Sequence, residues 1–118
     1  MTQVLFIQHR APSGSMSPAE TLDAALVSAA FGQTVSLLFQ GDGVWQLLPD
    51  QDTTNSGRKS LSAQLSALPL YDVEKLYADA ESLRERGLYG RTLALPVTVL
   101  DADGLRELLA CQHRILRF

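Results

Sequence analysis

Residues 4–39 decide the fold, and they read VLFIQHRAPSGSMSPAETLDAALVSAAFGQTVSLLF. The apolar run Val4-Leu5-Phe6-Ile7 combines β-branched and aromatic side chains, which is typical of a strand buried on both faces. A second strand is predicted from Thr34 to Phe39, and a helical pattern lies between the two runs. Because such a strand–helix–strand crossover is right-handed, the two strands are expected to be parallel.

Three independent signals mark the start of the helix between these strands. Ser17 can cap the helix, Pro18 occupies its first position, and Glu20 completes a capping box. The apolar residues that follow share one helical face: Leu22, Ala25, Leu26, Ala29 and Ala30. Gly32 is predicted to end the helix just before the second strand begins.

The rest of the chain continues the alternation with less regular patterns. Further helices are predicted for residues 44–48 before Pro49, for the stretch with Leu61, Leu65 and Leu68 before Pro69, from about Asp79 to Gly87, and from a capping Asp101 onward with Leu105, Leu108 and Leu109 buried. Strands are predicted for residues 73–78 and for part of 93–100, while residues 50–59 are expected to form an exposed loop. These elements predict an α/β fold, in which residues 1–118 form a single three-layer α/β/α domain with a mostly parallel sheet of about five strands.

The composition excludes several functional classes. The chain has 118 residues, of which 46% are hydrophobic, enough for one core without a disulfide or a structural metal. The net charge of −3 provides no basic field for nucleic-acid phosphates, so direct nucleic-acid binding is not expected. Charged residues make up only 19% of the chain, which suggests that part of the surface faces a protein partner.

The amino terminus has neither the basic region nor the apolar stretch of a secretory signal. The chain also lacks an apolar run that approaches the roughly 20 residues of a transmembrane helix. Its single cysteine cannot form an internal disulfide, which fits a reducing compartment. We therefore expect a cytoplasmic protein that does not bind membranes.

Cys111 is the only candidate thiol nucleophile. It falls near the carboxyl end of the last predicted helix, where the helix dipole disfavours a thiolate. That position is also far from the loops after the strand carboxyl ends, where open α/β sheets place their ligands. We expect Cys111 to be an inert, partly buried thiol.

His9 follows the first strand and lies beside the loop Ser13-Gly14-Ser15. This pair could form a phosphate cradle with His9 as acid or base, as in a small-molecule-binding or hydrolytic flavodoxin-like enzyme. The loop lacks the glycine spacing of dinucleotide-binding turns and the lysine of a P-loop. Two widely spaced histidines and one cysteine predict neither a metal site nor a cofactor, and we expect no active site.

Residues 41–49, GDGVWQLLP, have a different character. The two glycines allow a tight turn from strand to helix, and Asp42 can cap the short helix. Val44, Trp45, Leu47 and Leu48 cover more of the circumference than one core face needs, so the segment is either packed under the 50–59 loop or part of a subunit interface. Val44, Trp45 and Leu48, together with the chain end at Phe118, are the candidate interface.

The segments 41–49 (GDGVWQLLP), 70–74 (LYDVE), 82–88 (SLRERGL) and 115–118 (ILRF) resemble the DsrE/F-like family, in its TusC branch. The resemblance extends over essentially the whole chain, in the same order and spacing. It implies a five-stranded parallel sheet between helices. It also implies a subunit of a bacterial sulfur-relay complex, a heterohexamer with two copies each of TusB-like, TusC-like and TusD-like subunits.

In this family the complex passes persulfide sulfur from TusA to TusE for thiolation of the tRNA wobble uridine. The sulfur-carrying cysteine belongs to the TusD-like subunit. This chain agrees with a non-catalytic role, because Cys111 lies outside the quoted motifs. Two alternatives stay open: a DsrF subunit of a dissimilatory sulfur-oxidation complex, and the enzyme that would use His9 and the 13–15 loop.

Overall fold

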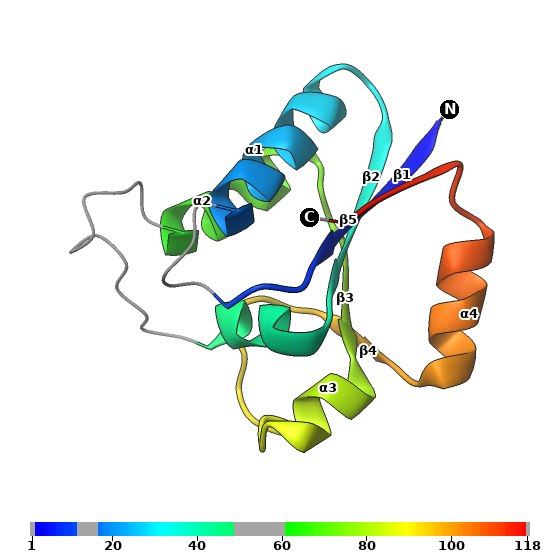
Figure 1. Ribbon diagram of the computed structural model, residues 1–118. Helices are drawn as coiled ribbons and strands as arrows, with labels where there is room; N and C mark the ends of the chain where they lie inside the picture. Colours follow the sequence, from blue (N-terminus) through cyan, green and yellow to red (C-terminus); the bar gives the residue numbers. More distant parts are fainter. Residues whose placement is uncertain (1, 12–16, 49–60, 118) are drawn as a thin grey trace.

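A central five-stranded sheet with helices on both faces forms the domain, as the computed structural model in Figure 1 shows. The structure describes residues 2–11, 17–48 and 61–117. The strands are β1 (Gln3–Gln8), β2 (Thr34–Phe39), β3 (Lys75–Asp79), β4 (Thr98–Leu100) and β5 (Arg114–Arg117). Their order is β4-β3-β2-β1-β5 and every pair is parallel. The predicted α/β class with a sheet of about five strands is confirmed.

Helices and helical turns connect these strands. The α-helices are α1 (Ser17–Ala30), α2 (Leu61–Ala67), α3 (Ala80–Glu85) and α4 (Ala102–Ala110), and the 3-10 helices are η1 (Gly41–Leu47) and η3 (Leu68–Tyr71). In Figure 1, α1 and α2 lie on one side of the sheet and α4 lies on the other. None of the helices in the described residues is long and apolar enough to cross a membrane.

The two faces of the sheet have cores of different size. Alternate strand residues such as Phe6, Leu37 and Phe39 are fully buried against α1, α2, η1 and α3 in the larger core. Leu5, Ile7 and Leu38 point the other way and pack with Leu108 of α4 in the smaller one. The first strand is therefore buried on both faces, as its continuous apolar run predicts.

Several capping predictions are confirmed. The Asp101 carboxylate accepts a hydrogen bond from the Gly104 backbone N–H at 2.9 Å, so Asp101 caps α4. Gly32 and Gly87 both have positive φ angles just after helices, where glycine avoids the strain that a Cβ would cause. The side chains of Ser17 and Pro18 lie outside the described residues, as do the 50–59 loop and Phe118.

Other predictions need correction. The third strand begins at Lys75 rather than at residue 73, because the Val73 N–H donates to the Leu68 carbonyl and completes η3. In the 93–100 region only Thr98–Leu100 forms a strand. In α4, Leu108 is buried, whereas Leu109 is 38% exposed because the short helix covers only part of its sheet face.

Candidate functional site

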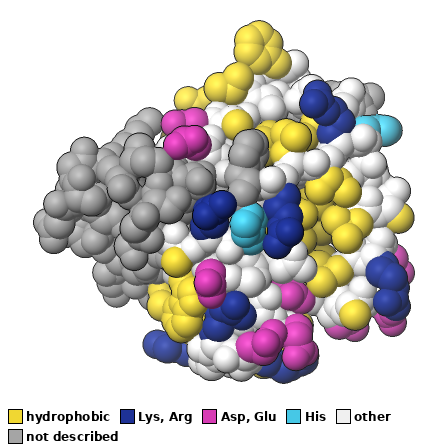
Figure 2. Space-filling view, viewed as in Figure 1, with side chains coloured by type: hydrophobic (Ala, Val, Ile, Leu, Met, Phe, Trp, Pro, Cys, Tyr) yellow, Lys and Arg dark blue, Asp and Glu magenta, His cyan; other side chains and the backbone are white. Residues whose placement is uncertain are grey.

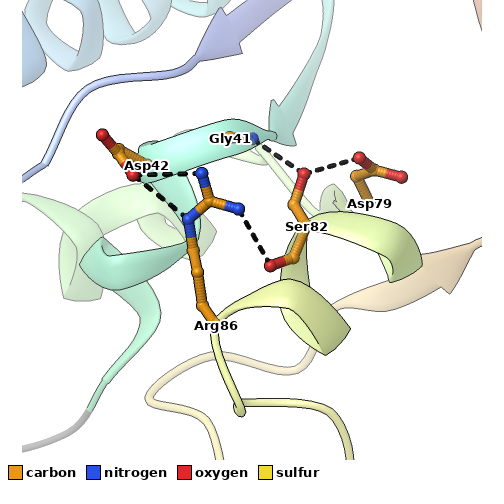
Figure 3. Close-up of polar contacts among 5 residues, drawn as sticks. All are labelled: Gly41, Asp42, Asp79, Ser82 and Arg86. Carbon is orange, nitrogen blue, oxygen red and sulfur yellow. Dashed lines mark hydrogen bonds and ion pairs between the residues drawn. The ribbon is translucent and has the colours of Figure 1, made fainter.

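The carboxyl ends of β2 and β3 are adjacent in the sheet, which is where open α/β sheets place their ligands. η1 follows β2 and α3 follows β3, so the two helical turns meet at this edge. Figure 3 shows the polar side chains and backbone groups that join them.

Ser82 of α3 is the centre of this network. The Gly41 backbone N–H donates to the Ser82 hydroxyl oxygen at 2.9 Å, and the hydroxyl donates to the Asp79 carboxylate at 2.6 Å. Ser82 and Asp79 are both buried, at 4% and 8% exposure. A hydroxyl has one proton to donate, and here it goes to a buried carboxylate inside the network. The arrangement clamps η1 to α3 and leaves Ser82 enclosed rather than open to a substrate.

Arg86 makes a second link between the same two elements. Its guanidinium donates to Asp42 Oδ1 from Nε and pairs with it from Nη2, both at 3.1 Å. Nη1 donates to the Ser82 carbonyl at 3.2 Å. Asp42 was expected to cap the short helix, but Gln40 holds that position and Asp42 sits in the first turn. Its carboxylate is therefore used for a tertiary contact rather than a cap.

Gly43 allows η1 to approach the end of β1. A Cβ at this position would lie 1.8 Å from the Gln8 carbonyl oxygen. Backbone atoms of a central strand cannot move away by the distance needed, so only glycine fits. The sequence predicted only that this glycine allows a tight turn. The structure shows that glycine is needed because η1 lies so close to the end of β1.

The apolar side chains of the Trp45 segment pack mostly into the core of the chain itself. Because η1 is a 3-10 helix, residues three apart lie above one another, and Val44 and Leu47 both enter the core at 0% exposure. Val44 thus presents no side chain to a partner in the single chain, contrary to the interface expectation. Trp45 and Leu48 are half-buried against the larger core. Their role at an interface, with that of Phe118, stays a prediction.

His9 lies at the carboxyl end of β1, close to Arg117 at the end of β5. Burial lowers the pKa of His9 below 6.5, and the charges of Arg117 and Arg10 lower it further. Cationic neighbours disfavour the imidazolium, whereas a general base is usually oriented by a carboxylate. Ser13 to Ser15, the other part of the proposed cradle, lie outside the described residues.

Cys111 is at the opposite end of the sheet. It follows α4 as its C-cap, and His113 two residues later hydrogen-bonds to Gln3 at the start of β1. Its thiol donates to the Leu108 carbonyl at 3.2 Å. The predicted place at a helix carboxyl end is correct. The expected partial burial is wrong, because Cys111 is exposed.

The sequence profile of the DsrE/DsrF-like family matches residues 2–118. The chain belongs to the DsrE/DsrF-like family. This membership agrees with the parallel sheet and with the resemblance noted in the four sequence segments. It extends over all of the described residues.

Named relatives within this family match over their full length. "Protein TusC homolog" of Pseudomonas aeruginosa is 46% identical over 113 residues, which cover 96% of this chain and 95% of the relative. "Protein TusC" of Escherichia coli K12 is 40% identical over 119 aligned residues and is covered completely, as is this chain.

Solved structures with similar folds have little sequence identity to this chain. The ychN protein from E. coli has a TM-score of 0.87 at 19% identity, with complete coverage of both chains. The conserved protein BT1422 from Bacteroides thetaiotaomicron has a TM-score of 0.70 at 15% identity, covering 98% of this chain and 94% of that one. At this identity the likeness establishes the DsrE/DsrF-like fold alone.

Sequence reasoning missed the roles of Ser82 and Arg86 in this family member. Both stand in the quoted segment 82–88, four residues apart, so Ser82 in α3 and Arg86 at its C-cap lie on one side of this helical turn. That spacing was the available signal, but their partners Gly41 and Asp42 lie about forty residues earlier in the chain.

Proposed function

We propose that this chain is a non-catalytic structural subunit of a TusBCD-type sulfur-relay complex in the cytoplasm. Its partners are a TusB-like and a TusD-like subunit, assembled as a heterohexamer with two copies of each chain. The complex accepts persulfide sulfur from TusA and passes it to TusE for thiolation of the tRNA wobble uridine. The chain itself touches neither tRNA nor membrane.

The full-length similarity to proteins named TusC carries this proposal. At 46% and 40% identity over almost the full length of both chains, the surfaces that contact partner subunits can be the same in this chain and in its relatives. The acidic balance of the chain, with a net charge of −3, also favours a protein partner over tRNA.

The polar groups at the carboxyl edge of the sheet support a non-catalytic role. There, Ser82, Asp79 and the Gly41 backbone satisfy one another in a buried network. The only cysteine is at the other end of the domain, next to backbone carbonyls of α4. Carbonyl oxygens at a helix carboxyl end oppose the negative charge that a sulfur-carrying thiolate needs.

Reconstitution tests the proposal directly. The chain is co-expressed with the TusB-like and TusD-like proteins of the same genome, and the purified complex is weighed by native mass spectrometry. Transfer of radiolabelled persulfide sulfur from TusA to TusE is then measured. We expect a heterohexamer whose activity requires all three subunits, and Cys111→Ser should transfer sulfur at close to the wild-type rate.

Two results would contradict the proposal. A chain that remains separate from both partners under these conditions is not a subunit of such a complex. If Cys111→Ser abolishes transfer while the heterohexamer still forms, the subunit is catalytic. His9→Ala serves as a parallel variant. Loss of a general acid or base typically lowers the rate by about a hundredfold or more, so a fall of that size in the sulfur-transfer rate would indicate a catalytic His9.

Trp45 provides a separate test of the predicted interface with Leu48 and Phe118. We expect Trp45→Ala to weaken assembly by about 2 kcal/mol or more, because buried tryptophans are frequent hot spots of subunit contacts. Thermal melts of the isolated chain provide the comparison. A variant that melts at lower temperature but still assembles quantitatively would assign Trp45 to the core alone.

A further inference from the structure

Four large apolar side chains are exposed at the end of the domain where α1 and η3 finish. Phe31 and Leu70 are 84% and 83% exposed, Val27 is 55% exposed and Tyr71 is 46% exposed. We call these four residues the α1–η3 patch. Isolated exposed apolar residues are ordinary on a protein surface, but four large ones on two elements that contact each other point to an interaction site.

The members of the patch come from neighbouring elements. Val27 and Phe31 are one turn apart, on the outer side of α1. A hollow of ≈320 Å³ joins the two elements, with Ala29 and Gly32 on one wall and Tyr71 on the other. Figure 2 shows hydrophobic side chains projecting from the upper end of the molecule, where Figure 1 places the carboxyl end of α1.

The backbone holds these side chains outward. The Phe31 N–H donates to Val27 and the Gly32 N–H donates to Ala29, and Gly32 has a φ of 87° that ends the helix. In η3, Leu68 is fully buried, so Leu70 two residues later points away from the core. Turning Phe31 or Leu70 inward would require breaking these helical turns.

Charge around the patch selects the kind of partner. The exposed acidic residues Asp72 and Glu74 follow η3 directly, and Asp23 and Glu20 lie earlier on α1, where Asp23 accepts a hydrogen bond from Gln64 of α2. The described residues of α1, α2, η3 and the turn 72–74 include no basic side chain, and Lys75, the first residue of β3, lines the hollow together with Asp72 and Glu74. A symmetric contact with a second copy would bring like charges together, which disfavours this occupant.

We propose that the α1–η3 patch docks a different subunit of the same complex, through an apolar surface rimmed by Lys or Arg. This inference rests on the proposed function. Gly32 and Tyr71 lead into the amino ends of β2 and β3, so the patch is at the opposite end from the Ser82 network. A partner docked there leaves the carboxyl edge of the sheet free for other contacts.

The test uses the full chain co-expressed with the TusB-like and TusD-like subunits. Phe31→Ser/Leu70→Ser should retain the melting temperature of the isolated chain, because both side chains are exposed. Its assembly should weaken at least about tenfold in a concentration series followed by mass photometry, as truncation of interface anchors requires. The matched control, Phe31→Leu/Leu70→Ile, keeps the patch apolar and should assemble like wild type.

Glu74→Lys tests the charge argument. It should slow association with the partner relative to Glu74→Gln, and the difference should shrink at high salt, because rim charges act mainly on the association rate. Equal association rates for the two variants at low salt would overturn the basic-rim assignment.

The remaining outcomes separate the two proposals. If wild type assembles and the double serine variant assembles equally well, the patch inference falls and the proposed function stands. If wild type fails to assemble with either partner, both fall. If the isolated chain is a dimer by light scattering and the serine variant is a monomer, the occupant is a second copy and the inference is overturned.

Discussion

η1 and the α1–η3 patch are both rich in apolar residues, yet the fold treats them in opposite ways. Val44 and Leu47 of η1 are fully buried, whereas Phe31 and Leu70 of the patch are more than four-fifths exposed. The tryptophan-containing turn is the more conspicuous feature of the sequence, but its apolar residues mainly complete the core. Apolar content therefore indicates an interface only after the residues needed by the domain itself are known.

Gly43→Ala should give the largest effect on stability. The added Cβ would meet the Gln8 carbonyl oxygen at 1.8 Å, and relief of this overlap requires moving η1 away from β1. We expect a loss of about 3 kcal/mol or more in the free energy of unfolding, measured in urea. Gly32→Ala, beside the patch, is the control. Open space surrounds Gly32, so only the strain of its positive φ, about 1 kcal/mol, should appear.

Leu47→Ala and Leu70→Ala compare the two regions with the same chemical change. The first removes a fully buried side chain and should cost about 2–5 kcal/mol of stability. The second removes a side chain that is 83% exposed and should change stability by less than about 0.5 kcal/mol. Equal costs in urea unfolding would mean that the patch is packed within the isolated chain, contrary to the structure.

Ser82→Ala measures how much the polar clamp contributes at the η1 end. The change leaves the Gly41 N–H without its acceptor and the buried Asp79 carboxylate without this donor. We expect a loss of about 1–3 kcal/mol. Asp42→Asn is the milder companion, because Asp42 is 61% exposed in its ion pair with Arg86 and such pairs contribute at most about 1 kcal/mol. If Ser82→Ala were as stable as wild type, the hydrogen bonds of Ser82 would not stabilise the fold.

His9 should show the smallest effect, visible in its titration. Burial first, then Arg117 and Arg10, lowers its pKa in the folded chain below 6.5. The unfolded chain therefore binds more protons just below pH 6.5, and the His9 contribution to stability is complete above that pH and declines as the pH falls. Arg117→Gln should raise the His9 midpoint part of the way towards 6.5 in an NMR titration, since burial persists. An unchanged midpoint would exclude Arg117 as a cause.

Local patterns in the sequence predicted much of the fold. The apolar run 4–7, the second run 34–39 and the glycine after α1 all appear where the pattern places them, because strand burial and helix ends depend on adjacent residues. Asp101 caps α4 for the same reason, through a bond to a residue three positions later. The first residue of β3 was misplaced because Val73 pairs with the preceding turn rather than with the sheet.

The candidate site was less predictable. Sequence reasoning pointed to His9, Cys111 and the Trp45 segment, and correctly placed His9 after β1 and Cys111 after α4. It gave no role to Ser82 or Arg86, whose partners are 41 and 44 residues away. It also named Val44 as an interface candidate, whereas Val44 is fully buried in the core with Leu47, three residues later in the 3-10 helix.

By itself, then, the sequence determined most of the order of strands and helices, the helix ends at Gly32, Gly87 and Asp101, and the continuous burial of β1, because these depend on neighbours along the chain. The tertiary structure alone decided that Val44 is enclosed, that Ser82 clamps η1 to α3, and that Phe31 and Leu70 stay in solvent. A side chain is buried when elements distant in the sequence pack against it. The local sequence around an apolar residue does not show whether such an element is present.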